Sequence, residues 1–521
     1  MEGREEGSVQ LFQAQWMEKT RALRPRVHCM TNYVTAQNVA NVILAAGGSP
    51  IMATGLYEAE DVEAACSSLV INIGTLDERV IPAMAKAGAE AVRLSHPVIF
   101  DPVGVGASRF RREAALQILR GVPVTLIRGN GSEIRTVLEA LRGQKGGQKS
   151  AEPCGIDARE EDTAGRDNAG KKAAIAEELA GLCGCIVVQT GETDIVTDSR
   201  RTYYIRNGHP WMAKTTGSGC MLDGFLGAVL GTAAGAAKGG SPDYLGAAAW
   251  AVCAFGACGE LAYSQCEARS DGIGSFPMRL IDAAGFLTDQ TVRERAQVLN
   301  RWEERKARIS RALCLYAVTD RRYSRNLEEF AAGIEAAVRG GVTMVQLREK
   351  DLPREEFLKE ARLVRELTSR FQVPLIIDDD LEVAVLCGAD GLHVGQEDMP
   401  AAEARKVLGT EKILGVTAKT EEQARAAQAA GADYVGSGAV FGSRTKADAK
   451  AMDYDTLKRI CGSVEIPVVA IGGITAENAD LLEGSGIAGA AVVSGIFGQK
   501  DIQQAAADLK KKILKIRGET E

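Results

Sequence analysis

The chain has 521 residues, about three times an ordinary domain of roughly 150, so two large domains are expected and a peptide hormone or disulfide mini-scaffold is excluded. Apolar residues make up 45% and charged residues 25%, which is an ordinary globular composition that can bury large cores. The 62 Lys and Arg against 69 Asp and Glu give a net charge of −7 without a long basic run, so nothing electrostatic supports a nucleic-acid or anionic-membrane surface.

The cysteine pattern indicates a reducing compartment. Twelve cysteines occur without a Cys-x-x-Cys pair, and MEGREEGSVQ contains no charged-then-apolar leader, which favours reduced thiols in a cytoplasmic protein. With four histidines in total, a histidine-rich metal site is not expected.

The first half alternates short apolar runs with helical segments. Long Ala-rich helices follow from Met221, and strand density falls away after Tyr204, so a layered α/β domain is predicted here rather than a barrel. Leu245 to Gly259 is the most apolar stretch; it is short, Ala/Gly-rich and followed by Glu260, which predicts a buried helix, with a membrane segment as the alternative. The predicted strands begin near Ser49, Leu69, Pro97, Thr125, Ile186 and Thr193.

One segment of this half is rich in Gly and charge. Between Gly143 and Lys172, Ile156 is the one large aliphatic residue, which predicts a surface insertion without a packed core.

A glycine-rich helix start is the candidate anion site of the first half. No G-x-x-x-x-G-K-[ST] sequence occurs, so a P-loop is excluded. TTGSGCMLDGFLGAVLG instead places Gly217, Ser218, Gly219 and Cys220 at the start of an apolar helix. Small residues let backbone amides face a ligand, and the helix N-terminus favours a phosphoryl group. Tight packing alone is the alternative explanation.

Further motifs connect this half with a known family. VHCMTNYVTAQNVAN at Val27 to Asn41, DPVG at Asp101, RGNGSEI at Arg128 and TGE at Thr190 occur in order with the glycine-rich segment. Together they resemble the hydroxyethylthiazole kinase family of the ribokinase-like α/β fold over about residues 20 to 290.

The resemblance implies roles for particular residues. Cys220 would orient or deprotonate the substrate hydroxyl, although a free Cys is a mediocre base unless the helix N-terminus lowers its pKa. ATP would be the co-substrate and Mg²⁺ the metal, held by oxygen ligands. The implied ATP-binding residues are Arg128 and Thr190, the thiazole-binding residues Met52 and Gly217, and the metal-binding residues Asp101 and Glu133.

The connection between the halves has a helical pattern. No Gly or Pro occurs between Gly285 and Gly333, and Val292, Leu299, Trp302 and Ile309 follow helical spacing. A helical connection is therefore predicted, with domains over residues 1–300 and 310–521.

The second half repeats a strand-then-helix unit from about Leu313 to the end. Eight such units in roughly 210 residues predict a closed (β/α)₈ TIM barrel, with an open doubly wound sheet as the alternative. Helices are expected at residues 327–339, 355–370, 420–430 and 475–483. The predicted strands begin at Leu315, Thr343, Pro374, Gly391, Ile413, Asp433, Val468 and Ala490.

The predicted strand ends of the barrel are polar, and active sites of such barrels lie there. One face of the second strand carries Gln346, Arg348 and Lys350. Burial of two cations there would cost free energy unless a bound anion neutralises them. The alternative is a solvated edge strand. Carboxylates at the ends of the third and fourth strands, Asp379 and Asp398 among them, suit Mg²⁺ beside a diphosphate.

Later strand ends supply a second anion subsite. FGSRTKADAK after the sixth strand offers hydroxyls and a cation, from Ser443, Thr445 and Lys446. Gly472-Gly473 and Ser494-Gly495 end the seventh and eighth strands, a place where barrels of this kind bind a phosphate.

This constellation resembles thiamine phosphate synthase from Leu313 to about Lys510, through QLREK, GLHVGQEDMP, the Ser-Arg-Thr-Lys loop and VVAIGGIT. Asp378 stands where the family commonly has Asn, and Thr417 where Ser is common. The resemblance implies magnesium at Asp379 and Asp398, and Lys446 as a leaving-group cation. The implied ligands of the pyrimidine diphosphate are Gln346, Arg348, Lys350, Asp378, Thr417 and Lys446, and those of the thiazole phosphate are Ser443, Thr445, Gly473, Val493 and Ser494.

The sequence therefore predicts a bifunctional enzyme in which a thiazole kinase supplies the substrate of a thiamine phosphate synthase. One alternative is a kinase fused to a non-synthase barrel, an isomerase or regulator that binds thiazole phosphates. Another makes one half a catalytically inactive scaffold. The kinase resemblance also implies a homo-oligomer, a trimer with its site between subunits; the remaining partners are small-molecule substrates, without nucleic acid or membrane.

Overall fold

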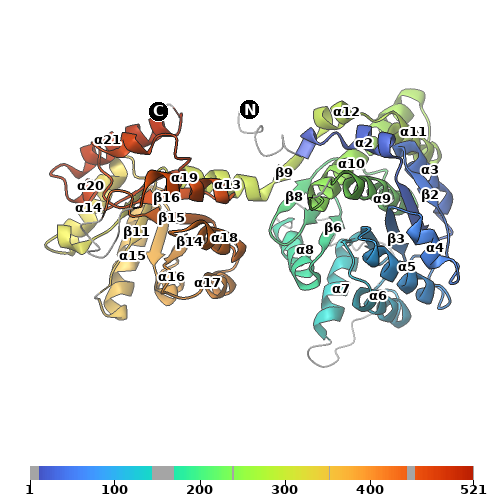
Figure 1. Cartoon of the computed structure of the whole chain (residues 1–521), viewed down its shortest axis with the longest axis horizontal. Coiled ribbons are helices and arrows are strands. Elements are labelled where there is room, and N and C mark those ends of the chain that lie inside the picture. Colours follow the sequence, from blue (N-terminus) through green and yellow to red (C-terminus); the bar gives the residue numbers. More distant parts are fainter. Residues whose placement is uncertain (1–10, 144–168, 238–239, 351, 443–451, 520–521) are drawn as a thin grey trace. The chain divides into compact units, whose positions relative to one another are not determined.

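The computed structural model describes residues 11–143, 169–237, 240–350, 352–442 and 452–519. Backbone contacts divide the chain into two compact units, Met1–Glu303 and Glu304–Glu521. Each unit has its own sheet, a nine-stranded open sheet in the first and a closed barrel in the second (Figure 1).

The sheet of the first unit has the order β2-β1-β3-β4-β5-β6-β7-β8-β9. The ladders from β2 to β6 are parallel, and β7, β8 and β9 continue the sheet antiparallel. The strands are β1 (Arg26–Met30), β2 (Ser49–Ile51), β3 (Ser68–Asn72), β4 (Val98–Asp101), β5 (Leu126–Asn130), β6 (Ile186–Thr190), β7 (Asp194–Thr197), β8 (Thr202–Ile205) and β9 (Val298–Asn300).

Helices cover both faces of this sheet because its central strands are apolar on both sides. In β3, Val70 packs into one core, while Leu69 and Ile71 pack into the other, as the two-residue period of a strand requires. One face carries α2 (Trp16–Leu23), α3 (Ala36–Ala46), α9 (Ser218–Ala236), α10 (Tyr244–Arg269) and α11 (Phe276–Phe286), and the other α5 (Ile81–Arg93), α6 (Arg109–Gly121), α7 (Gly131–Gly143) and α8 (Ala169–Cys183). The short elements are α4 (Ala59–Ala64), η3 (Ile273–Ser275) and α12 (Asp289–Arg295).

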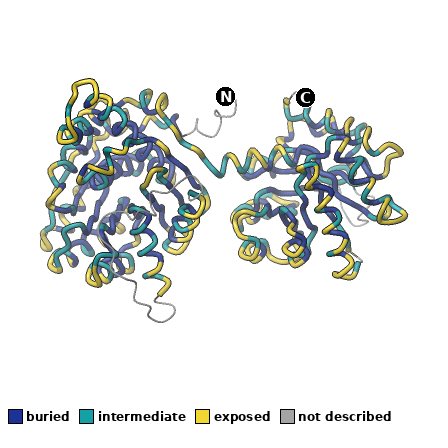
Figure 2. The backbone as a smooth tube through the Cα atoms, turned by 180° about the vertical axis from the view of Figure 1, so that it is seen from behind, coloured by how far each residue is buried: buried dark blue, intermediate teal, exposed yellow. Residues whose placement is uncertain are grey.

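The most apolar stretch is a buried helix, as predicted. Both α9 and α10 are long and apolar enough to span a membrane by length and composition, but 78% and 89% of their most apolar 18-residue segments are buried inside the fold. Figure 2 colours the backbone of each unit by this burial. Trp250 and Phe255 of α10 are fully or almost fully buried, so the helix forms the core of this unit.

The connection is not one continuous helix. Residues 289–312 form α12, then β9, then α13 (Arg301–Ala312). β9 pairs antiparallel with β8, with Tyr204 opposite Leu299, and so adds a strand to the sheet. The predicted helical pattern is correct for α12 and α13 and wrong between them.

The second unit is the predicted closed barrel of eight parallel strands. Its interior core contains Tyr316, Met344, Ile376, Tyr434 and Val469. The strands are β10 (Leu315–Val318), β11 (Met344–Leu347), β12 (Leu375–Asp378), β13 (Gly391–Val394), β14 (Ile413–Thr417), β15 (Tyr434–Gly438), β16 (Val468–Ile471) and β17 (Gly489–Val492).

The helices of the barrel include the predicted ones with one exception: the segment 475–483 contains only a short 3-10 helix, η5 (Ala479–Leu482). The others are η4 (Arg321–Tyr323), α14 (Leu327–Arg339), α15 (Arg354–Arg370), α16 (Leu381–Leu386), α17 (Ala401–Leu408), α18 (Glu421–Ala429), α19 (Tyr454–Ser463), α20 (Ser494–Phe497) and α21 (Ile502–Ile516).

Candidate active sites

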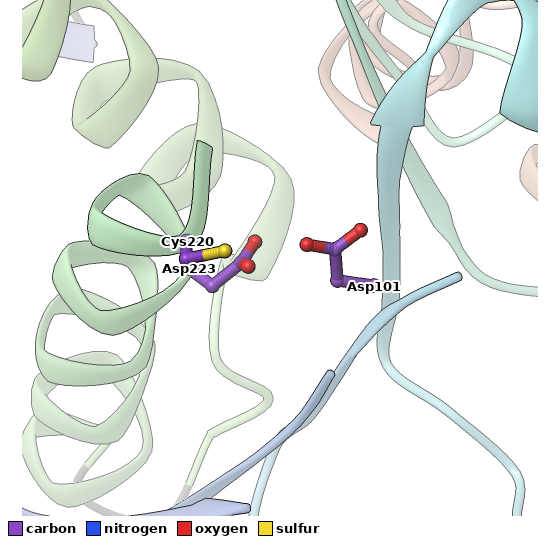
Figure 3. Close-up of side chains that lie close together, drawn as sticks. All are labelled: Asp101, Cys220 and Asp223. Atoms are coloured by element: carbon purple, nitrogen blue, oxygen red, sulfur yellow. The ribbon is translucent and has the colours of Figure 1, made fainter. Parts of the chain in front are cut away.

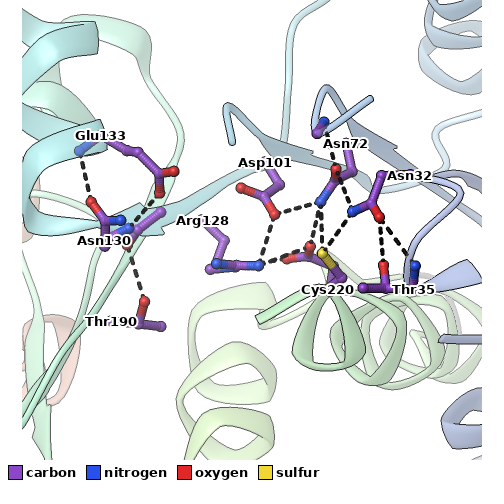
Figure 4. Close-up of polar contacts among 12 residues, drawn as sticks. Asn32, Thr35, Asn72, Asp101, Arg128, Asn130, Glu133, Thr190 and Cys220 are labelled. Carbon is purple, nitrogen blue, oxygen red and sulfur yellow. Dashed lines mark hydrogen bonds and ion pairs between the residues drawn. The ribbon is translucent and has the colours of Figure 1, made fainter. Parts of the chain in front are cut away.

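The first site lies where the strand order of the open sheet reverses. β2 and β3 lie on opposite sides of β1, and a crevice forms outside the carboxyl ends of strands at such a point. Asn32 follows β1, Asn72 ends β3 and Asp101 ends β4, and all three are buried. They meet the first turn of α9, which carries Cys220 (Figure 4).

Two asparagines hold the Cys220 thiol. Nδ2 of Asn32 donates to Sγ at 3.1 Å, and Nδ2 of Asn72 donates to it at 3.4 Å. Burial raises the pKa of the Cys220 thiol, the Asp223 carboxylate raises it further, and Arg128 opposes both. The thiol therefore stays protonated near neutral pH, despite its place at a helix N-terminus.

Arg128 forms the charged part of the same cluster. Its Nη2 contacts Oδ2 of Asp101 at 2.7 Å, and its Nε contacts Oδ1 of Asp223 at 2.8 Å, with all three side chains buried. A Cβ added to Gly219 would lie 2.7 Å from both Nη1 and Nη2 of Arg128, so the guanidinium lies directly against the start of α9.

Three potential ligand side chains lie close together beside Arg128: Asp101, Cys220 and Asp223. One ligand atom from each lies within 4.8 Å of the others (Figure 3). Oδ1 of Asp101 is buried and has no hydrogen-bond partner among the described residues. This oxygen is therefore a position for a cation or a ligand donor.

The other predicted kinase residues occupy neighbouring strand ends. Glu133 accepts the amide of Gly104 at 2.8 Å and that of Asn130 at 2.9 Å, which ties the loop after β4 to the end of β5. Thr190 ends β6 opposite Asn130. Gly217 has φ 85°, and a Cβ there would lie 2.3 Å from Cγ2 of Thr35, so this position requires glycine. Met52 follows edge strand β2 and is 40% exposed.

The second site is a cavity of about 180 Å³ at the carboxyl ends of the barrel strands. Active sites of this fold lie at that end. Of the predicted residues, those that line it are Gln346, Arg348, Asp378, Thr417, Gly473, Val493 and Ser494.

Opposite charges alternate at the ends of β11 and β12. Arg348 Nε and Lys350 Nζ lie 3.4 Å and 3.5 Å from Oδ2 of Asp378, and Lys350 also forms an ion pair with Asp379. Asp398 accepts the amide of Gly395 at 2.7 Å. Lys350, predicted to bind the diphosphate, and Asp379, predicted to bind the metal, are thus in direct contact.

Glycines shape the opposite wall of the cavity. Gly472 and Gly473 have φ 105° and 67°, and a Cβ on Gly473 would lie 2.8 Å from the carbonyl oxygen of Phe441. Val493 and Ser494 stand at the start of α20, directly after β17.

Comparison with known proteins gives the family. The hydroxyethylthiazole kinase family model matches residues 17–290, and the thiamine monophosphate synthase model matches residues 315–496. The chain is 37% identical over 506 residues to the "Thiamine biosynthesis bifunctional protein ThiM/ThiE" of Symbiobacterium thermophilum, covering 96% of this chain and 98% of that protein. The chain belongs to this bifunctional thiamine biosynthesis family.

Single-function relatives match each half. The kinase half is 40% identical over 283 residues to a hydroxyethylthiazole kinase of Clostridium botulinum, covering 54% of this chain and 94% of that protein. The synthase half is 52% identical over 202 residues to "Thiamine-phosphate synthase 2" of Streptococcus pneumoniae, covering 39% of this chain and 96% of that protein. The predicted family and fold class are confirmed.

The structure adds residues that sequence reasoning missed. In the kinase half these are Asn72 and Asp223; Asp223 follows Cys220 by three residues, a spacing that places both on one face of a helix. In the synthase half they are Tyr316, His393 and Tyr434, inside the barrel. The predicted Ser443, Thr445 and Lys446 lie outside the described residues, as does most of the predicted insertion between Gly143 and Lys172.

Proposed function

We propose that the kinase half transfers the γ-phosphoryl group of ATP to the hydroxyl of 4-methyl-5-(2-hydroxyethyl)thiazole, and that the synthase half couples the product to 4-amino-5-hydroxymethyl-2-methylpyrimidine diphosphate. The products are ADP, thiamine phosphate and diphosphate. The observation that carries this proposal is that each half gathers polar residues of its predicted site at the carboxyl ends of parallel strands. We assign the two activities to residues 1–300 and 310–521.

In the kinase reaction, Cys220 contacts and orients the substrate hydroxyl. Because burial and Asp223 keep its thiol protonated, the geometry supports positioning more than proton abstraction. The backbone amides of Gly217 to Cys220 stabilise the charge on the transferring phosphoryl group. Arg128 and Thr190 bind ATP, with Arg128 held in place by Asp101 and Asp223.

The residues present fit magnesium in both halves. In the kinase half, the buried, unpartnered Oδ1 of Asp101 would hold it together with Glu133. In the synthase half, Asp379 already accommodates the cation of Lys350, and Asp379 with Asp398 would hold the metal. Magnesium supplies charge neutralisation on the phosphate oxygens of ATP and of the diphosphate.

In the synthase reaction, the C–O bond between the pyrimidine methylene carbon and diphosphate breaks, and the thiazole nitrogen then bonds to that carbon. Arg348, Lys350 and Lys446 bind the leaving diphosphate, where the negative charge develops. Gln346, Asp378 and Thr417 bind the pyrimidine. The thiazole phosphate is bound by Ser443, Thr445, Gly473, Val493 and Ser494. The thiazole nitrogen carries its own lone pair, so this step requires no protein base.

We further propose that the enzyme is a cytoplasmic homo-oligomer, a trimer assembled through the kinase half. The exposed Met52 supports a thiazole site that a second copy completes. The described cysteines are all free, which supports a reducing compartment. Measurement of the mass in solution tests the assembly, and a monomer would contradict it.

A coupled assay tests the function. Thiazole, ATP, Mg²⁺ and the pyrimidine diphosphate are supplied together, and ADP and thiamine phosphate are measured separately. Cys220→Ala should lose ADP release but still form thiamine phosphate from supplied thiazole phosphate. Lys446→Ala should show the reverse, with turnover falling more than thiazole phosphate binding. Absence of both products from the folded native enzyme would contradict the proposal, and nearly full turnover of Cys220→Ala would contradict the role of that residue.

A further inference from the structure

Five side chains form one hydrogen-bonded chain along the wall of the synthase cavity. Nε2 of Gln346 donates to the Tyr316 hydroxyl at 2.9 Å, and that hydroxyl lies 2.8 Å from the hydroxyl of Tyr434. The Tyr434 hydroxyl lies 3.0 Å from Nδ1 of His393, and Nε2 of His393 lies 2.9 Å from Oγ1 of Thr417. Four of the five line the cavity, namely Gln346, Tyr316, His393 and Thr417, and Tyr434 joins Tyr316 to His393 inside the barrel.

The barrel strands make room for this chain. A Cβ added to Gly415 of β14 would lie 2.1 Å from Cζ of Tyr434 and 2.5 Å from Nδ1 of His393. A Cβ on Gly436 of β15 would lie 3.2 Å from Cε1 of His393. Two neighbouring strands thus carry glycine where the polar side chains cross, in a part of a barrel that apolar side chains ordinarily fill.

With the Gln346 amide nitrogen as the donor to Tyr316, the remaining hydrogen bonds follow in one direction. The Gln346 amide nitrogen donates, so Tyr316 accepts there with its oxygen. Among the described residues the other partner of the Tyr316 hydroxyl is Tyr434, so the Tyr316 hydrogen goes to the Tyr434 oxygen. The opposite direction would leave the hydrogen of Tyr316, which is 1% exposed, without an acceptor among the residues that the structure describes.

The remaining steps follow. Tyr434 passes its hydrogen to Nδ1 of His393, which makes Nδ1 an acceptor and leaves the ring proton on Nε2. Nε2 donates to Oγ1 of Thr417. Thr417 then accepts from His393, and because it lines the cavity, its own hydroxyl hydrogen is available to an acceptor bound there. Burial raises the pKa values of Tyr316 and Tyr434 above the ordinary tyrosine value. Both hydroxyls therefore keep the hydrogens that they donate in the direction from Gln346 to Thr417.

We propose that this chain fixes Thr417 as a hydrogen-bond donor, so that the synthase selects a substrate ring with an acceptor nitrogen at that point. The inference rests on the proposed synthase function, whose aminopyrimidine has ring nitrogens with free lone pairs. Tyr434 and His393 are positioning residues: they act through Thr417. Their role is to set the direction of its hydrogen bond.

The tautomer of His393 in the native enzyme tests the inference directly. In the NMR spectrum of native full-length enzyme labelled with ¹⁵N-histidine, His393 should carry its proton on Nε2. The His393 resonances are those that disappear in the His393→Asn variant. In Tyr434→Phe, which removes the hydrogen given to Nδ1, the Nδ1–H form should appear. A native His393 that carries its proton on Nδ1 would overturn the inference, even if the Tyr434 variant fails to fold.

A double-mutant cycle separates positioning from packing. Tyr434→Phe should raise the KM for the pyrimidine diphosphate about fivefold and leave that for thiazole phosphate unchanged. In a Thr417→Val background, Tyr434→Phe should have no further effect, whereas in Thr417→Ser, which keeps the hydroxyl, the full effect should remain. Tyr454→Phe is the matched control, because it removes a tyrosine hydroxyl that donates to the carbonyl of Glu483 outside the chain. If the native enzyme forms thiamine phosphate but the effects of the Tyr434 and Thr417 substitutions on KM add, the inference is overturned. If the native enzyme forms no thiamine phosphate, the proposed function itself fails.

Discussion

The Arg128 guanidinium donates twice to the Asp223 carboxylate, from Nε at 2.8 Å and from Nη2 at 3.0 Å. Both side chains are buried, and 95 residues separate them in the chain. Asp223 and Cys220 lie in the first turns of the same helix, so this ion pair fixes the proposed ATP-binding cation against the element that carries the proposed substrate-orienting thiol.

Asp223→Asn tests this coupling. The substitution keeps the shape of the side chain but removes its charge and turns an amide donor toward a donor guanidinium. The kinase half should lose about 3–5 kcal/mol of stability, as expected when one partner of a buried ion pair is removed. ADP release should fall at least about tenfold, while thiamine phosphate formation from supplied thiazole phosphate stays unchanged.

The exposed pair Arg79–Asp77 provides the control for that substitution. Its atoms lie 2.5 Å apart, but the Arg79 side chain is 86% exposed. Asp77→Asn should therefore change the unfolding temperature and ADP release little. If Asp77→Asn and Asp223→Asn changed the unfolding temperature and ADP release equally, the ion pairs of Arg128 would contribute no more to stability or kinase activity than an exposed pair.

A glycine at the start of α9 keeps the Arg128 guanidinium in place. In Gly219→Ala the new Cβ would lie 2.7 Å from Nη1 and Nη2 of Arg128, so the guanidinium must move away from the helix N-terminus. The KM for ATP should rise about tenfold, although alanine favours the helix itself. Gly121→Ala is the matched control, because nothing lies within 4 Å of a Cβ at that position. An unchanged KM in Gly219→Ala would contradict the role assigned to Arg128.

Most strands can be predicted from the sequence because their apolar runs are bounded by Gly, Pro or Asp, and this pattern predicts all eight barrel strands. β1 was missed because its segment contains buried polar groups. His28 is fully buried, and its Nδ1 contacts the Glu63 carboxylate at 3.0 Å, a contact that hydrophobic patterning cannot reveal. β9 was missed because residues 298–300 are only partly buried and lie between two helices.

The candidate sites were predictable where a local motif carries the chemistry, as for Cys220, Arg348 and Gly473. Asp223 and Asn72 were not predictable, because their roles depend on partners from distant strands. Helical spacing places Asp223 beside Cys220, but only the fold shows that Arg128 lies between Asp223 and Asp101. The same holds for Tyr316, Tyr434 and His393, which read as core residues of apolar strands.

A buried acid pair outside the synthase cavity predicts a pH dependence of stability. Burial, with the neighbouring Glu360 adding to it, raises the pKa of Glu349 from about 4.5 to about 7, and Arg321 opposes the shift. Because the pKa in the folded state lies above the ordinary value, this contribution to stability is fully present below about pH 4.5 and is lost as the pH rises through about 7.

Thermal unfolding of the full chain between pH 5 and 8.5 measures this effect. The synthase transition of the native chain should decline between about pH 5 and 7 and level off above about pH 7, and Glu349→Gln, which cannot ionise, should flatten the decline. Glu356→Gln, at an exposed position of α15, serves as the control and should follow the native profile. A Glu349→Gln profile parallel to the native one would contradict the prediction.

Asp378 stands where the synthase family commonly has asparagine. Its contacts predict how the substitution Asp378→Asn changes diphosphate binding. Its Oδ2 lies 3.4 Å from Arg348 Nε and 3.5 Å from Lys350 Nζ, so the carboxylate offsets part of the charge proposed to bind the diphosphate. Asp378→Asn removes that negative charge and leaves both cations to the ligand. The KM for the pyrimidine diphosphate and the inhibition constant of diphosphate should each fall about fivefold, which corresponds to about 1 kcal/mol. Because the diphosphate product also binds more tightly, kcat should not rise.

Asp380→Asn is the matched control. Asp380 pairs with Arg354 on α15 at 3.0 Å, so the KM for the pyrimidine diphosphate and the inhibition constant of diphosphate should both stay unchanged. A higher inhibition constant for diphosphate in Asp378→Asn would show instead that the carboxylate positions the two cations for the ligand.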